Sequence, residues 1–158
     1  MKMRAASVLV TLIIAISSLY AQLAERKLIL SIGGGLPAAR QLTIKTLGTG
    51  DFSATGFGLP FTDSGLTKFE YHRAISEADS ARLFALSSQA AREWRGTGES
   101  WPDCKGAKLD IQGGAERIHT ASGCISDAWL SRQSIREFVA FLDGLLPTGW
   151  TVSEVISF

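Results

Sequence analysis

Hydrophobic and polar residues alternate along much of the chain between residues 27 and 72, as in β-strands that are buried on one face. Four segments have this strand pattern: residues 27–32, 41–47, 52–57 and 66–72. Turn-forming stretches such as Gly33-Gly34-Gly35 and Gly48-Thr49-Gly50-Asp51 separate them. Short alternating strands joined by turns predict an antiparallel meander, with one face packed on a core and the other in water.

The hydrophobic period then changes to that of a helix. One stripe between residues 76 and 94 carries the apolar side chains of Leu83, Leu86, Ala90 and Trp94. Ser76 and Asp79 have the spacing of a capping box, and Gly96 and Gly98 follow as terminators. We expect a core-facing helix here, with Trp94 in the core.

A second hairpin is predicted over residues 107–112 and 116–121, joined by Gly113-Gly114-Ala115. If Gln112 faces Glu116, the same register places Cys104 opposite Cys124, beyond the open end of the hairpin. If the chain reaches an oxidising compartment, an even number of cysteines favours a disulfide bridge. Two free thiols are the alternative, while the spacing of the cysteines and histidines gives no support to a metal site.

A second amphipathic helix follows the hairpin. Its apolar side is formed by Ile135, Phe138, Val139, Leu142 and Leu146. Ser131 is the expected cap, Gly144 and Pro147 mark the end, and residues 151–156 have the pattern of a last short strand. The fold class is therefore α+β: a two-layer sandwich of an antiparallel sheet (strand meander, helix, hairpin, helix) with two helices on one face.

The N-terminus has the layout of a secretory signal peptide. Lys2 and Arg4 precede an uncharged apolar run over residues 5–16, and small or polar residues lead to Ala21. The alternative, a membrane anchor, needs about 20 apolar residues. We expect residues 1–21 to be removed, or residues 1–24 if cleavage follows Ala24. A single domain over residues 22–158 then reaches the periplasm or the medium.

Composition narrows the classes of function. The chain has 158 residues, 46% of them hydrophobic, and a formal net charge of +1. Removal of Lys2 and Arg4 from the 16 basic residues leaves slightly fewer than the 15 acidic ones. This balance argues against a nucleic-acid-binding protein and against membrane binding after removal of the signal.

Candidate catalytic groups are few. His72 and His119 lie on the polar sides of predicted strands, there is no Gly-x-Ser-x-Gly elbow, and no sequence motif indicates a cofactor or metal. Carboxylates such as Asp103, Asp110 and Glu116 leave open a small hydrolase that uses two carboxylates. We expect a protein that is not an enzyme.

Exposed apolar residues are the best candidates for a binding site. Phe57, Leu59 and Phe61 lie among glycines and a proline, and Trp101 lies in a second loop beside Pro102. Exposed apolar groups mark interaction sites, so these four residues are partner-binding candidates. The alternative is that the loop of residues 56–61 folds down as a lid on the core.

The order of the elements resembles that of emfourin-type inhibitors of thermolysin-like metalloproteases. The resemblance covers residues 27–146: the Leu28-x-Leu30-x-Ile32-x-Gly34 opening, the meander, the first helix, the hairpin and the second helix. It implies a non-enzymatic domain with a protein partner, which could be a protease. We therefore expect an exported small binding domain; a hydrolase, or a carrier of a small apolar ligand between sheet and helices, remains an alternative.

Overall fold

The computed structural model describes residues 25–33, 41–58, 67–94, 105–113, 116–125 and 130–156. The strands are β1 (Lys27–Gly33), β2 (Gln41–Leu47), β3 (Asp51–Gly58), β4 (Thr67–Ala74), β5 (Gly106–Gly113) and β6 (Glu116–Cys124). The helices in this part of the chain are α2 (Glu77–Glu93), α4 (Gln133–Asp143) and α5 (Val152–Ile156). The expected signal peptide, residues 1–21, lies outside the described residues.

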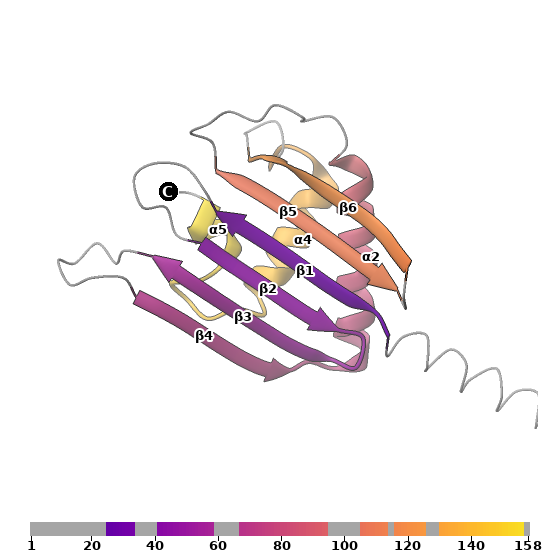
Figure 1. Cartoon of the computed structure of the whole chain (residues 1–158), viewed down its shortest axis with the longest axis horizontal. Coiled ribbons are helices and arrows are strands. Elements are labelled where there is room, and N and C mark those ends of the chain that lie inside the picture. The colour runs from indigo at the N-terminus through magenta and orange to yellow at the C-terminus, as the bar shows by residue number, and fades with distance from the viewer. Residues whose placement is uncertain are drawn as a thin grey trace, which may run out of the picture.

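The strands form one six-stranded sheet in the order β4-β3-β2-β1-β5-β6. Every neighbouring pair is antiparallel. β1 to β4 are the predicted meander, and α2 carries the chain back from the edge strand β4 to β5, which pairs with β1. Figure 1 shows α2, α4 and α5 behind the sheet, on the same face. The predicted α+β class and two-layer arrangement are confirmed.

The core lies between the sheet and these helices. The inward positions of the central strands are the predicted ones: Leu28, Leu30, Ile32, Leu42 and Ile44 are at most 3% exposed. Leu83 and Phe84 of α2, and Ile135, Phe138 and Leu142 of α4, close the core from the other side. Each such side chain contributes about 1.5–3 kcal/mol by leaving water, so the alternating pattern fixes which face of the sheet the helices cover.

The N-terminus of α2 matches its sequence signal. Ser76 is the N-cap, and its Oγ accepts a hydrogen bond of 3.0 Å from the backbone N–H of Asp79. This bond satisfies one of the helix's free N–H groups. Trp94 follows the last helical residue and is buried, as predicted.

The predicted cap of the second helix is wrong. Arg132, not Ser131, is the N-cap of α4, and it makes no side-chain capping hydrogen bond. The first turn of α4 has no acidic residue either, but the Oγ of buried Ser134 donates to the carboxylate of Glu93, at the end of α2. A carboxylate from another helix therefore lies at the positive end of α4, where it is favourable.

The last short strand predicted over residues 151–156 is also wrong, because this segment is helix α5. Thr151 and Glu154 form a reciprocal capping box: the N–H of Thr151 donates to Glu154 Oε2, and the N–H of Glu154 donates to Thr151 Oγ1. At the other end, Lys105 Nζ donates to the carbonyl oxygens of Val155 and Ile156. Capping at both ends stabilises a helix too short to form by itself.

The hairpin is confirmed, but its predicted register is not. Gly113, not Gln112, pairs with Glu116, and a bulge between Ile111 and Gln112 shifts the pairing by one further residue, so Gly106 pairs with Cys124. Cys104 is therefore not the register partner of Cys124. Cys124 is buried and the described residues contain no free cysteine, while Cys104 lies outside them. The Cys104–Cys124 bridge stays a prediction.

Candidate functional site

The sheet has one face that no helix of the described chain covers, and we call it the open face (Figure 1). It consists of the odd-numbered positions of β1, β2 and β3 and the even-numbered positions of β4 and β5, as the pairing of the strands requires. Most of these side chains are polar, in keeping with contact with water. Large apolar side chains on this face are therefore the positions that point to a binding function.

Phe57 is the main exception. Its side chain is 48% exposed, and Leu47, at 40%, is the other large apolar residue of the described chain that is exposed to this degree. β3 continues to Gly58, so Phe57 belongs to a strand and lies between Gln41 and Lys68 on the open face. For Phe57 the lid alternative is wrong, because alternation turns it away from the core. Leu59, Phe61 and Trp101 lie outside the described residues.

Gly56 shows why Phe57 faces outward. A Cβ atom at Gly56 would lie 2.3 Å from Cζ3 of Trp150, so the indole ring occupies the place of a side chain on the inner face of β3. Trp150 also stacks on Phe69, the strand partner of Gly56, with ring centroids 4.5 Å apart. Trp150 therefore covers the inner face of the sheet at β3 and the edge strand β4. The sequence signal for this contact was the glycine within a strand.

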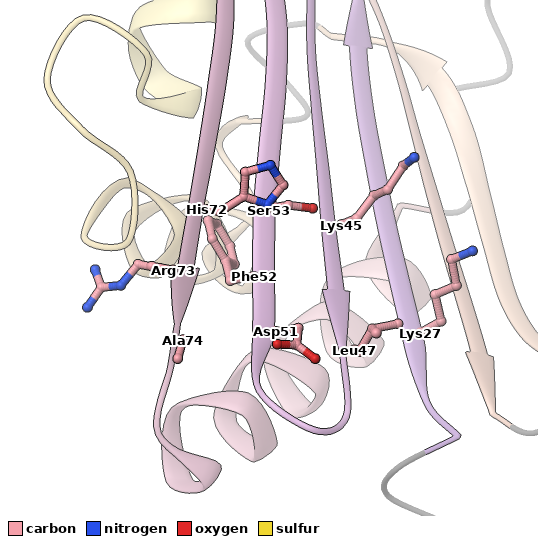
Figure 2. Close-up of a pocket in the computed structure, with 9 residues that line it drawn as sticks. All are labelled: Lys27, Lys45, Leu47, Asp51, Phe52, Ser53, His72, Arg73 and Ala74. Atoms are coloured by element: carbon pink, nitrogen blue, oxygen red, sulfur yellow. The ribbon is translucent and has the colours of Figure 1, made fainter.

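The other end of the open face carries a hollow of about 640 Å³. Figure 2 shows its lining, which comes from β1, β2, β3 and β4. The lining residues are Lys27, Lys45, Leu47, Asp51, Phe52, Ser53, His72, Arg73 and Ala74. The small side chains of Ser53 and Ala74 leave room between longer ones. Sequence reasoning missed this hollow, because its residues meet only through the order of the strands.

The charges of the open face are unevenly paired. Lys68 forms an ion pair with Glu70, and Lys108 Nζ lies 3.0 Å from the carboxylate of Asp110. The hydrogen bond and positive charge of Lys68 hold the pKa of Glu70 below its ordinary value. Lys27 and Lys45, in the hollow, form no ion pair within the described residues. The hollow therefore keeps positive charge available for a ligand.

The described residues offer little for catalysis. His72 is exposed, as predicted, and the side chain of His119 lies outside the description. Asp110 is the one buried carboxylate of the described chain, and Lys108 neutralises it. Within the same residues no group of three His, Cys, Asp or Glu side chains is placed to bind a metal ion, and no helix is both long and apolar enough to cross a membrane. No protein-family model matches the sequence, and a comparison with curated proteins finds no match.

Proposed function

We propose that this protein is an exported, non-enzymatic domain that binds another protein through the open face of its sheet. The domain acts after removal of residues 1–21, in the periplasm or the medium, and a Cys104–Cys124 bridge braces its second hairpin. It uses no cofactor. The partner contacts Phe57 and, beyond the described residues, Leu59, Phe61 and Trp101.

The exposure of Phe57 carries this proposal. Phe57 lies near one end of a polar sheet face and is half exposed, so it forgoes about half of the 1.5–3 kcal/mol that complete burial of such a side chain provides. A partner that covers the ring recovers this free energy, and aromatic residues are enriched among the anchors of protein interfaces. Phe57 lies between Gln41 and Lys68, which could form the polar rim of such a contact.

The sharpest form of the proposal is inhibition of a thermolysin-like metalloprotease. Support comes from the order of the described elements, which is the order on which the resemblance to emfourin-type inhibitors rests: meander, helix, hairpin, helix. The additional helix α5 follows the segment that the resemblance covers. A family of inhibitors needs a rigid contact surface and no catalytic groups, and a sheet face provides such a surface.

The two alternatives receive less support from the described residues. A carboxylate-dependent hydrolase needs a pair of acidic groups held in a cleft, whereas Asp110 lies against Lys108. A carrier needs space between sheet and helices, whereas buried side chains such as Leu30, Leu83 and Phe138 occupy that layer. The hollow lies on the opposite face of the sheet.

The direct test is a titration of a thermolysin-like metalloprotease with the purified protein, with cleavage of a fluorogenic peptide as the readout. Stoichiometric loss of activity supports inhibition, and Phe57→Ser should weaken it. If the protease keeps its activity, the protein immobilised as bait should capture a partner from the envelope or medium in a Phe57-dependent way. Absence of any Phe57-dependent partner would contradict the proposal.

A further inference from the structure

The hollow on the open face brings together two lysines that have no acidic partner among the described residues. Lys27 and Lys45 stand on the adjacent strands β1 and β2, and the ion pairs described for this face involve Lys68 and Lys108 instead. Asp51 is the acidic residue of the lining, and it accepts a hydrogen bond of 3.0 Å from Thr49 Oγ1. The lining thus carries two lysines and one carboxylate, which already accepts a hydrogen bond, so the hollow has a net positive charge.

The strand register fixes the spacing of these groups. Lys45 pairs with Ser53, and Ser53 pairs with His72, so the three side chains form one row across β2, β3 and β4. Lys27 pairs with Leu47, two residues along β2 from Lys45. Lys27 and Lys45 are therefore diagonal neighbours, at about 7–8 Å between their backbones.

This diagonal spacing fits an extended peptide. Side chains on one face of an extended chain repeat every second residue, at about 6.6–6.8 Å. Acidic residues at positions i and i+2 of such a chain can each meet one lysine, while Ser53 and His72 supply hydrogen-bond donors beside them. A single compact dianion such as phosphate would have to draw both lysines to one point.

We infer that the hollow binds an extended acidic segment of the partner protein, with alternate carboxylates at Lys27 and Lys45. This inference rests on the proposed function and adds the chemistry of the partner to it. Phe57 and the hollow lie at opposite ends of the same strand, β3, so one partner can use the aromatic anchor and the basic hollow together. The lysines then steer the partner to the face, and the apolar contact holds it.

The test uses an oligoglutamate peptide and the ¹⁵N-labelled protein. We expect the peptide to shift the amide signals of Lys27, Lys45, Ser53 and His72 at low salt, with oligoglutamine as the uncharged control. Lys27→Gln and Lys45→Gln should each weaken binding about threefold, and the double variant about tenfold. Lys108→Gln, which removes a paired lysine from the same face, should change the affinity less than about twofold.

Three results would overturn the inference. These are no binding, equal losses for Lys108→Gln and Lys45→Gln, and equal shifts with inorganic phosphate, which would make the hollow a site for free anions. The proposed function fails separately, if no partner depends on Phe57. If a partner is still lost with Phe57→Ser but is indifferent to the lysine variants, the open face binds protein and the acidic segment is wrong.

Discussion

The indole ring of Trp150 lies parallel to the ring of Phe69, with the ring planes 7° apart and the centroids 4.5 Å apart. The same indole covers Gly56, the strand partner of Phe69. One contact therefore joins the segment before α5 to the two outer strands of the meander. It also leaves the next residue of β3, Phe57, on the opposite face.

Gly56→Ala should destabilise the protein by about 2 kcal/mol, because the new methyl group would overlap the indole and force it away from Phe69. Gly106→Ala is the matched control. Its Cβ would lie 3.5 Å from the nearest atom, which is ordinary contact, so its effect should stay within about 0.5 kcal/mol. Urea unfolding of the two variants measures the difference in stability, and equal stabilities would show that the Trp150 ring does not pack against Gly56.

Thr46→Val should stabilise the protein by about 1 kcal/mol. The Oγ1 of Thr46 is fully buried and has no hydrogen-bond partner in the part of the chain that the structure describes, so its replacement by a methyl group of similar volume removes a desolvation cost. Thr43→Val, on the same strand but on the open face, controls for the strand preference of valine. A loss of stability specific to Thr46→Val, measured by urea unfolding, would mean that the hydroxyl has a partner in solution.

The ion pair between Lys68 and Glu70 predicts a low titration midpoint for the Glu70 carboxyl group. The pKa of Glu70 is lowered by the hydrogen bond and charge of Lys68, so the pair contributes to stability above the ordinary carboxyl pKa. The contribution is lost as the pH falls through the lowered value. Carboxyl ¹³C chemical shifts should give Glu70 a low midpoint that rises in Lys68→Met; an unchanged midpoint would rule out the pair.

Replacement of both Cys104 and Cys124 by alanine should lower stability by about 3 kcal/mol and the melting temperature by roughly 10 °C, because the unfolded chain gains freedom when a long loop is opened. Thermal unfolding by circular dichroism measures the change. The prediction requires that native protein recovered from the envelope resists thiol labelling. Labelling of both cysteines without denaturant would contradict the bridge.

The elements that sequence reasoning located have strong periodic signals. Apolar residues recur at every second position in β1 and β2 and along one stripe of α2, and the structure buries these positions. The reason is that the strands and the helix pack against one shared core. The wrong predictions lie where a local feature, such as a helix cap or a bulge, overrides the hydrophobic pattern. The apolar residues of 151–156 suggested a strand, although Thr151 and Glu154 already carried a helix-capping signal. The bulge at Ile111 left no readable trace in the sequence.

The candidate site was predictable only in part. Phe57 was found because large apolar residues among glycines and a proline are unusual, and the strand predicted over residues 52–57 already contained it. The contact of Trp150 with Gly56, which marks the opposite face of β3 as the inner one, was not predicted. The hollow was not predictable. Lys27, Lys45 and His72 come from three strands, and their proximity depends on the β1–β2, β2–β3 and β3–β4 pairings rather than on any local spacing.

The central claim is that Phe57 binds a partner and does not support the core. Phe57→Ser and Phe69→Ser make the same chemical change in adjacent strands, on opposite faces of the sheet. The decisive measurement combines the melting temperature and partner binding of each variant. We predict that Phe57→Ser melts within about 2 °C of the wild type and loses the partner, while Phe69→Ser loses several degrees of melting temperature. A strongly destabilised Phe57→Ser, or one that binds the partner as well as the wild type, would contradict the account.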